Sequence, residues 1–417
     1  MKFGKILSAS VVAGLLAAAP FAAATAADQA DNKEKAQPHQ ERQWQASKSS
    51  RHGKSGEQRS VGQLTFIGEQ RIPNDEKFKD TLVGGLSGID YDPKTDRWVM
   101  ISDDRSDNNP ARFYTGELNY DTKDFYSVHI TGVTEFKQPD GTAYPNKKQY
   151  TETKTGVVSD LESIRFDPKT RSIWYTSEGD RSLAFDPFVR QANKKGDYVS
   201  SFPIPEAFKM SESSDGSMKK GFRNNITLEG SSFSPDGKYY FTAMEASLYQ
   251  DGDISTADSG SYARMTKYDR SGAILAEYAY RVDAIPAKPG EGKNADNGVS
   301  EMLAINDHQF LMLERAGVQA SDGQYANYIR IYEVDTDQAT NVKDFDSLKS
   351  SEFTPVSKKL VLDLNTLHLP KLDNVEGISW GPKLKNGHDS LVLISDNNFN
   401  SSQVTQFLAF DVSPAAK

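Results

Sequence analysis

Residues 161–180 read LESIRFDPKTRSIWYTSEGD, and this stretch decides the fold. It begins with a run that favours β-structure, continues through the turn sequence DPKT, and ends in a second, strongly apolar run. Two such runs joined by a short turn predict a β-hairpin. Carboxylates stand near both ends of this hairpin, at Glu162 and Glu178. They call for an explanation, because a carboxylate at an apolar site is costly without a partner.

The same plan recurs four more times along the chain. Each copy is a strand, a turn rich in Pro, Gly, Asp or Asn, and a second apolar strand. The other copies are LSGIDYDPKTDRWVMISDD (86–104), LEGSSFSPDGKYYFTAMEAS (228–247), SEMLAINDHQFLMLERAG (300–317) and VEGISWGPKLKNGHDSLVLISDNN (375–398). Further strand-like segments lie between the copies. Repeated four-stranded units of this kind predict an all-β protein with the β-propeller fold.

The spacing of the repeats leaves the number of blades open. Five hairpins are visible, and the interval 104–160 is long enough to contain another, so we favour six blades, with five or seven as alternatives. The repeats are longer than a usual propeller blade, which predicts long loops. We expect TLVGGLSGI (81–89) to pair with TQFLAFDV (405–412) and close the ring, since closure removes free sheet edges. A β-sandwich or an irregular β-barrel is the rival fold, and the shared register of five hairpins argues against it.

The first 60 residues differ in composition from the rest of the chain. Residues 1–27 contain a positively charged start, an apolar run and the small residues ATA (24–26), a pattern that predicts a cleaved export signal. A membrane anchor is the alternative, and Pro20 interrupts the short run that would form it. Residues 28–60 are polar and predict a disordered linker, which leaves residues 61–417 as the propeller domain. We therefore expect a periplasmic or secreted protein with no stable membrane span.

Composition excludes several classes of function. The chain has 417 residues, no cysteine and a formal net charge of −9. The absence of cysteine excludes disulfides, thiolate metal sites and cysteine nucleophiles. The negative charge argues against nonspecific binding to nucleic acid or to an anionic membrane. We expect a monomer that binds a small anionic molecule through local arginines or a bridging cation.

Aligning the five hairpins places a polar or ionisable residue near the start of each first strand. These residues are Ser87, Glu162, Glu229, Glu301 and Glu376. In an antiparallel hairpin the start of the first strand lies beside the end of the second. The residues expected at the ends of the second strands are Asp103, Glu178, Glu245, Glu314 and Asp396. If the hairpins are the inner strands of the blades, these side chains surround one mouth of the central channel.

Such a ring of carboxylates predicts a cation site. Like charges at close range raise each other's pKa or recruit a cation, and hard oxygen ligands suit Ca²⁺ best and Mg²⁺ less well. The alternative for each acid is a local structural contact with a backbone N–H or a neighbouring arginine. We favour metal binding for the set, because turn chemistry does not require Glu in four of five repeats. The expected ligands are Asp103, Glu162, Glu178, Glu229, Glu245, Glu301, Glu314, Glu376 and Asp396.

Several of these stretches resemble a known family. LEGSSFSPDGKYYFTAMEA (228–246), NVEGISWGP (374–382), SDNNFN (395–400) and the closing TQFLAF are similar to the bacterial family called esterase-like activity of phytase, or phytase-like proteins. The resemblance covers roughly residues 62–412. It implies a β-propeller outside the cytoplasm and a role in ester or phosphoester hydrolysis. The ligands of true β-propeller phytases, which use calcium, do not map onto this chain residue by residue.

The chemistry that these residues suit best is metal-assisted hydrolysis of a phosphoester. Glu229 and Glu376 would help to hold the cation and to activate a water molecule. Arginines near the mouth would bind the phosphate through paired N–H groups, although a salt bridge to an adjacent acid is the alternative for each. The candidate arginines are Arg105, Arg190 and Arg315, with Arg264 as a weaker fourth.

Other mechanisms fit the sequence less well. The chain has no G-x-S-x-G nucleophile elbow and no H-E-x-x-H zinc motif. None of the six histidines has a motif that assigns it as a base for Ser87 or Ser300. Two further functions stay open. One is binding of a ligand or partner at the mouth without turnover, and the other is hydrolysis of a carboxylic ester or a lactone.

Overall fold

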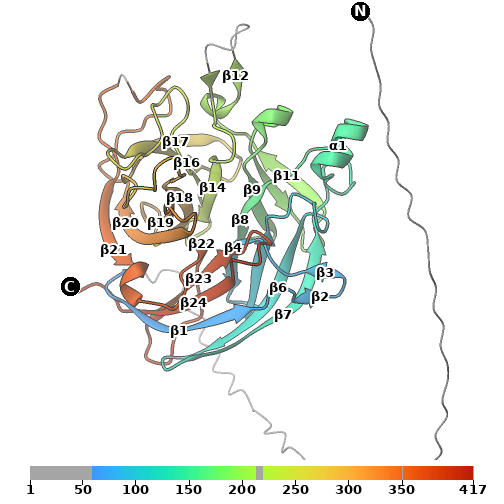
Figure 1. Ribbon diagram of the computed structural model, residues 1–417, viewed down its shortest axis with the longest axis vertical. Coiled ribbons are helices and arrows are strands. Elements are labelled where there is room, and N and C mark those ends of the chain that lie inside the picture. Colours follow the sequence, from blue (N-terminus) through green and yellow to red (C-terminus); the bar gives the residue numbers. More distant parts are fainter. Residues whose placement is uncertain (1–58, 213–218, 350, 417) are drawn as a thin grey trace, which may run out of the picture. The chain divides into compact units, whose positions relative to one another are not determined.

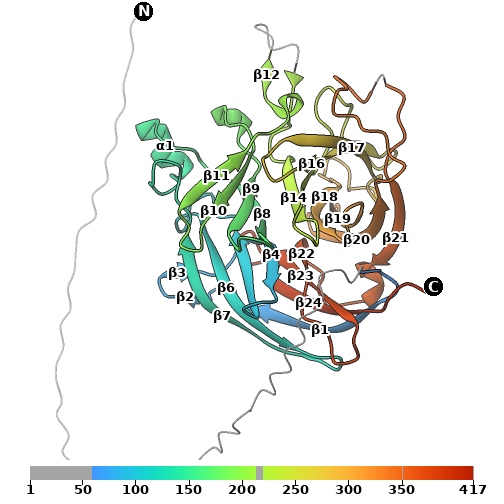
Figure 2. The same cartoon turned by 180° about the vertical axis from the view of Figure 1, so that it is seen from behind.

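The computed structural model describes residues 59–212, 219–349 and 351–416. The predicted export signal, and the predicted linker up to residue 58, lie outside these residues. The described strands form five four-stranded antiparallel sheets arranged around a central axis, as Figure 1 and the reverse view in Figure 2 show. The protein is therefore a β-propeller, which confirms the predicted fold class.

Four of the blades are formed by strands that follow one another in the chain. The first contains β4 (Leu86–Asp92), β5 (Arg97–Ser102), β6 (Arg112–Tyr120) and β7 (Phe125–Glu135). The second contains β8 (Leu161–Phe166), β9 (Ile173–Ser177), β10 (Phe188–Ala192) and β11 (Tyr198–Phe202). The third contains β14 (Leu228–Phe233), β15 (Tyr240–Met244), β16 (Ser261–Tyr268) and β17 (Ile274–Val282). The fourth contains β18 (Gly298–Ala304), β19 (Gln309–Gln319), β20 (Tyr325–Asp335) and β21 (Ser357–Asp363).

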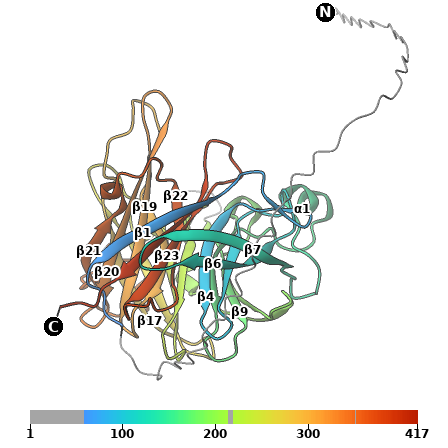
Figure 3. The same cartoon turned by 90° about the horizontal axis from the view of Figure 1, so that it is seen from below.

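The fifth blade combines strands from the two ends of the described chain. It contains β22 (Asn374–Trp380), β23 (Asp389–Asp396), β24 (Thr405–Val412) and β1 (Leu64–Ile72). Strand β1 pairs with β24 along its whole length, and in Figure 3 the blue β1 lies beside the red C-terminal strands. The prediction that TQFLAFDV closes the ring is thus confirmed for the C-terminal strand. Its predicted partner is wrong, because TLVGGLSGI holds β3 and the start of β4 instead.

The ring has five blades, one of the numbers left open by the sequence, and not the six that we favoured. The interval 104–160 holds β6 and β7, which complete the first blade, and the short helix α1 (Lys147–Thr153). The inner strands β4, β8, β14, β18 and β22 contact one another in a closed cycle. The other short elements are β2 (Lys77–Phe78), β3 (Thr81–Leu82), β12 (Ser211–Glu212), β13 (Lys219–Lys220), η1 (Arg181–Leu183), η2 (Glu206–Phe208) and η3 (Leu364–Leu367). None of the helices in the described part of the chain has the length and apolar character needed to cross a bilayer.

The five predicted hairpins are the two innermost strands of the five blades. Their second strands are buried on both faces, which explains their continuous apolar sequences. The core lies between neighbouring blades, where for example Trp98 and Tyr114 of the first blade pack with Val392 and Phe407 of the fifth. Burial specifies the register of each hairpin, because a slip of one residue exchanges the two faces of a strand.

Candidate functional site

Each inner hairpin carries a β-bulge at the same point, near the start of its first strand. The ladder of backbone pairs skips Ser87 in the first blade and Glu376 in the fifth. A bulge leaves one residue unpaired and re-aims its side chain. The residues at this point, which we call the first ring, are Ser87, Glu162, Glu229, Ser300 and Glu376.

A second set of side chains stands where the second strands return to the same end of the channel. Ser102 pairs with Leu86 just before the bulge, and Asp103 follows it. In each of the other four blades, a residue of the second strand pairs with the residue just before the bulge in the same way. The next residue along the second strand then occupies the position of Asp103. These residues, which we call the second ring, are Asp103, Glu178, Glu245, Arg315 and Asp396.

The fourth blade departs from the sequence alignment by one residue. The alignment placed Glu301 and Glu314 in the two rings, whereas Ser300 and Arg315 occupy those positions. Because successive side chains of a strand point to opposite faces, a shift of one residue turns a side chain away from the mouth. The second ring therefore contains one arginine among four carboxylates.

Glu301 and Glu314 have structural partners elsewhere in the protein. Glu301 is buried inside the channel, where Ser163 Oγ donates a hydrogen bond to it at 2.9 Å and Arg165 Nη2 lies 2.8 Å from it. Glu314 is buried against the outer strand β17, where Tyr280 donates a hydrogen bond of 2.7 Å. Neither residue lines the cavity at the mouth, so their positions do not match the metal-ligand role that the alignment assigned to them.

Eight residues of the two rings, all except Ser87 and Ser300, line one cavity of about 890 Å³, which we call the mouth cavity. Nine carboxylates line it, and seven of them belong to the rings: Asp103, Glu162, Glu178, Glu229, Glu245, Glu376 and Asp396. Arg105 and Arg315 also line it, and Tyr325 and Leu369 contribute to a less polar side of its rim. Acids from four different blades therefore converge on one opening, as their repeated positions in the sequence predicted.

The carboxylate oxygens form two close groups. Asp103, Asp160 and Glu162 each place one oxygen within 4.8 Å of the others, and so do Glu162, Glu178 and Glu229. Asp160 was not selected from the sequence. It precedes the hairpin, and no repeat marks it, because the chain has other residue types at the corresponding points of the other blades.

The two arginines of the mouth are held by acids in different ways. Arg105 Nε lies 2.6 Å from Asp160 Oδ1. Arg315 lies 3.6 Å from a carboxylate oxygen of each of Glu245, Asp296 and Glu376, which is longer than a hydrogen bond. Arg315 Nε forms no hydrogen bond with any residue that the structure describes. Although burial opposes it, the surrounding carboxylates raise the pKa of Arg315, so this guanidinium stays charged.

Burial has the largest effect on the pKa values of the acids Glu162, Glu229 and Glu376 of the mouth. Burial, and next the charge of a neighbouring Glu, raises the pKa of both Glu162 and Glu229 well above the usual range. Burial raises the pKa of Glu376 to about 7, although Arg315 lowers it. Nine lining carboxylates and Asp160 stand against Arg105, Arg315 and Lys371, so negative charge is in excess. Protons or a bound cation must compensate it near neutral pH.

Glu162 shows that the mouth suits a cation. The residue is 6% exposed, and its carboxylate accepts no hydrogen bond and forms no ion pair with any residue that the structure describes. Buried polar groups nearly always have a partner. Ca²⁺ binds oxygens at 2.3–2.6 Å, so two oxygens on one ion lie up to about 5 Å apart. The spacing of the two carboxylate groups therefore fits a divalent cation with hard oxygen ligands.

Two of the predicted arginines lie away from the mouth. Arg190 is on β10, where its guanidinium lies 4.0 Å from the ring centroid of Phe188 and donates a hydrogen bond to Tyr144. Arg264 is fully buried and pairs with Asp251. Neither lines the mouth cavity, because both belong to the third strand of a blade, outside the inner hairpin. The expectation that Arg190 contacts a bound phosphate does not match this position.

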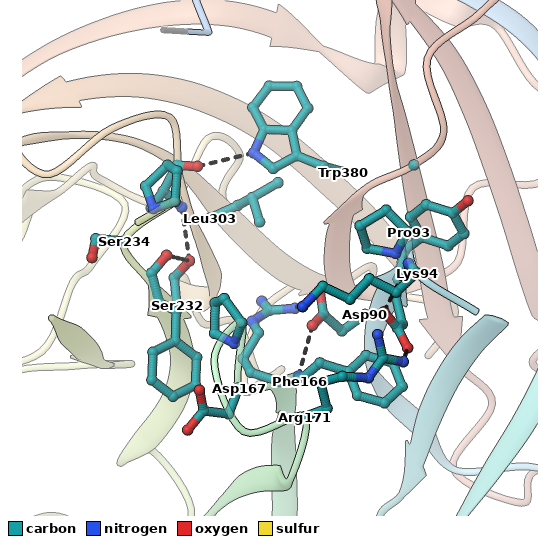
Figure 4. Close-up of a pocket in the computed structure, with 18 of the residues that line it drawn as sticks. Asp90, Pro93, Lys94, Phe166, Asp167, Arg171, Ser232, Ser234, Leu303 and Trp380 are labelled. Carbon is teal, nitrogen blue, oxygen red and sulfur yellow. Dashed lines mark hydrogen bonds and ion pairs between the residues drawn. The ribbon is translucent and has the colours of Figure 1, made fainter. Parts of the chain in front are cut away.

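A second cavity, of about 220 Å³, lies where the inner strands end, opposite the mouth. Figure 4 shows its lining, with Lys94 and Asp167 from two DPKT turns, Phe166 from β8 and Trp380 from β22. Its buried polar groups are paired, since Asp90 accepts a hydrogen bond of 2.8 Å from the backbone of Phe166.

Arg165 crosses the channel between the two cavities. From β8 it donates hydrogen bonds to the carbonyls of Ile89, Ser231 and Met302, which belong to three other blades. Together with its ion pair to Glu301, this buried side chain joins four blades across the channel. The mouth cavity is therefore the better candidate for a site that binds a charged ligand.

Residues 81–399 match the phytase-like family, described as esterase-like activity of phytase. The chain belongs to this family. The match confirms the resemblance seen in the repeated hairpins, and it includes every residue of the two rings. No curated protein matches this phytase-like chain.

Similarities to solved structures are weak. The catalytic domain of a GH62 alpha-L-arabinofuranosidase from Coprinopsis cinerea aligns over 86% of this chain and 99% of that domain, at 9% identity and a TM-score of 0.39. The tail fibre of Staphylococcus aureus phage P68 aligns over 61% of this chain and 50% of that chain, at 9% identity and a TM-score of 0.25. Similarities of this strength support no inference about the activity of the phytase-like chain.

Proposed function

We propose that this phytase-like protein is an exported, metal-dependent hydrolase that cleaves a phosphoester at the mouth cavity. Ca²⁺ is the expected ion, and Mg²⁺ is the alternative. The observation that carries the proposal is the excess of carboxylates over arginines in one cavity, where no described residue forms a hydrogen bond or an ion pair with the Glu162 carboxylate. Membership of the phytase-like family supports a hydrolase built on a propeller.

The carboxylates of the two rings and Asp160 would hold the cation. Bound there, the ion would supply positive charge to the phosphate and stabilise the charge that develops as the ester bond breaks. Glu162, Glu229 and Glu376 lie on inner strands, and the other ligands lie at or directly beside the ends of strands, so we expect their positions to change little when a substrate binds. The fit rests on the oxygen chemistry and spacing of the side chains.

The two arginines of the mouth would bind the phosphate. Arg315 suits this role because its Nε forms no hydrogen bond with a described residue and its three ion pairs are long. Arg105 has a side chain that is 39% exposed, so it can reach a ligand from the rim. Guanidinium groups match phosphate oxygens through two parallel N–H groups.

Acids of the first ring would activate the attacking water. The side chain of Asn374 donates a hydrogen bond of 2.7 Å to Glu376 Oε1 and thereby orients this carboxylate. Glu229 lies in the same ring and lines the same cavity. A carboxylate within hydrogen-bonding reach of a water molecule can accept its proton as the water attacks phosphorus.

The substrate class and the location of the protein belong to the same proposal. A small phosphoester or another small anion matches a cavity of about 890 Å³ with two arginines. Export to the periplasm or the medium rests on the sequence of residues 1–27. We also propose that the protein acts as a monomer.

Hydrolysis of two simple esters tests the proposal. The full chain is dialysed against a chelator, and initial rates on an aryl phosphate and an aryl acetate are measured with and without added Ca²⁺. We expect phosphate release that requires Ca²⁺. We expect Arg315→Gln to lower kcat/KM by about 100-fold, as loss of a charged contact of about 3 kcal/mol would do.

The matched control is Arg281→Gln, which removes an exposed arginine on β17 outside the mouth and should leave the rate unchanged. Turnover of the acetate alone would indicate a carboxylesterase. No turnover of either ester with Ca²⁺ present would contradict the proposal and leave ligand binding as the function.

A further inference from the structure

We propose that the mouth cavity holds two divalent cations, bridged by Glu162. This inference rests on the proposed metal-dependent function, and it specifies the number of ions and the residue that joins their sites. One site consists of Asp103, Asp160 and Glu162, and the other of Glu162, Glu178 and Glu229.

The spacing of the carboxylates supports two sites better than one. Within each group the three oxygens lie within 4.8 Å of one another, as ligands of a single ion do. Among the residues that the structure describes, the five acids do not meet this spacing as one set. A single ion therefore cannot bind all five in this arrangement, whereas two ions that share Glu162 can.

Each group contains a pair of carboxylates that needs its own positive charge. Asp103 and Asp160 place carboxylate oxygens within 4.8 Å of each other, and so do Glu178 and Glu229. Two carboxylates at this distance repel unless a proton or a cation lies between them. An ion in one group leaves the pair in the other group uncompensated.

Glu162 has the properties of a bridging ligand. It is the one residue common to the two groups, it is only 6% exposed, and no described residue pairs with its carboxylate. A carboxylate has two oxygens and can bind one cation with each. Two-metal sites in hydrolases place their ions about 3.5–4 Å apart, which a shared carboxylate spans.

The two sites differ in the positive charge that the protein already supplies. Arg105 Nε lies 2.6 Å from Asp160 and 3.9 Å from Asp103, so it partly compensates the first group. No described arginine or lysine forms an ion pair with Glu178 or Glu229; Arg315 pairs with other acids. We therefore expect tight binding at the Glu178–Glu229 site and weaker binding at the site beside Arg105.

Counting bound calcium tests the proposal without use of activity. The full chain, freed of metal with a chelator, is dialysed against CaCl₂ at pH 8, and bound Ca²⁺ is measured by atomic spectroscopy and by calorimetric titration. We expect two ions per chain, bound in a tight step and a weaker step. Glu229→Gln should remove the tight step, and Asp103→Asn should remove the weaker step.

Glu162→Gln separates a bridging ligand from an ordinary one. We expect it to weaken both steps by about tenfold or more, because each ion loses a charged ligand. Asp296→Asn is the matched control, since Asp296 lines the same cavity but belongs to neither group, and it should still bind two ions. Thermal unfolding of each variant in chelator verifies that it is folded.

Several results would overturn the proposal: one ion per chain, no ion at all, or a Glu162→Gln variant in which only one step changes. Hydrolysis of a phosphoester with one bound ion would contradict the proposed two-ion site but would remain consistent with the proposed hydrolase function. Two bound ions without hydrolysis of a phosphoester would support the bridged pair and contradict the proposed hydrolase.

Discussion

Single side chains decide the charge of the mouth. In the fourth blade Ser300 and Arg315 stand where the other blades have mostly acids, which places a guanidinium among the carboxylates. A local signal marks the correct register: an apolar residue, then a polar residue, then glycine, as in Leu228–Gly230 and Val375–Gly377. Alignment of Val299 with these apolar positions would have identified Ser300 in place of Glu301.

Replacement of Glu301 by Gln should affect stability and not calcium binding. Glu301 pairs with Arg165 inside the channel, and both side chains are buried. We expect Glu301→Gln to lower the free energy of unfolding by about 3 kcal/mol, because a buried guanidinium loses its counter-charge. Urea unfolding in chelator and a calcium titration measure the two effects.

Glu229→Gln is the comparison variant, with the opposite pattern. It removes a carboxylate that no described residue neutralises through an ion pair, so it should bind less calcium at little cost in stability. If Glu301→Gln bound less calcium and kept its stability, Glu301 would have to belong to the mouth.

At the scale of the strand, glycines let inner strands of neighbouring blades approach closely. Gly88, Gly230 and Gly377 follow the bulges of the first, third and fifth blades. A Cβ atom at Gly88 would lie 2.5 Å from the carbonyl oxygen of Glu162, and one at Gly230 would lie 2.8 Å from the backbone nitrogen of Met302. Any larger residue would force the backbones apart. In these three blades the glycine and the bulge therefore act together to place the residue of the first ring.

Gly88→Ala should disturb both the fold and the mouth. The added methyl group would meet the backbone of Glu162, so we expect a loss of about 1–3 kcal/mol in the free energy of unfolding, as for other overpacked sites. Calcium affinity should fall as well, because Glu162 is displaced. Urea unfolding and calcium titration measure these changes.

Gly141→Ala is the control for the glycine at the bulge. Gly141 has a φ of 82° and no atom within 4 Å of an added Cβ, so this variant carries backbone strain without a steric contact. We expect a loss of about 1 kcal/mol and unchanged calcium affinity. Equal effects of both substitutions on calcium affinity would contradict the role given to Gly88.

At the scale of the whole molecule, the buried acids couple stability to pH and to cations. Burial raises the pKa of Glu376, Glu301 and Glu277 to about 7, from 4.5 in the unfolded chain. The folded state therefore binds more protons than the unfolded state between these values. Their contribution to stability is full below about pH 4.5 and is lost as the pH rises through about 7.

In chelator, the thermal midpoint should fall as the pH is raised from 5 to 8. A shift from 4.5 to about 7 corresponds to about 3 kcal/mol for one such group at the upper end of this window. Added Ca²⁺ should reverse the part of the loss that comes from the acids of the mouth, because the ion replaces their protons, and not the part that comes from Glu301 and Glu277, which lie outside the mouth. Circular dichroism melts at several pH values, with chelator and with CaCl₂, measure this. A thermal midpoint that stays constant or rises with pH in chelator would contradict the prediction. It would show that groups of the protein already balance the charge of these buried acids.

The hairpins are encoded locally. Strand, turn and second strand lie within about twenty residues, and alternation, turn chemistry and apolar runs are properties of neighbours in the chain. The family resemblance, the five inner hairpins and the carboxylates at Glu162, Glu229 and Glu376 could therefore be predicted.

The features of the fold and the site that the sequence did not predict depend on contacts between residues far apart in the chain. Closure by β1, the count of five blades, and the presence of Asp160 beside Glu162 depend on how one blade packs against another. The face on which Glu301 lies depends on a bulge whose register is specified by burial on both sides of the strand. A pattern along the chain does not encode these contacts directly, because they join residues whose separation in sequence has no fixed period.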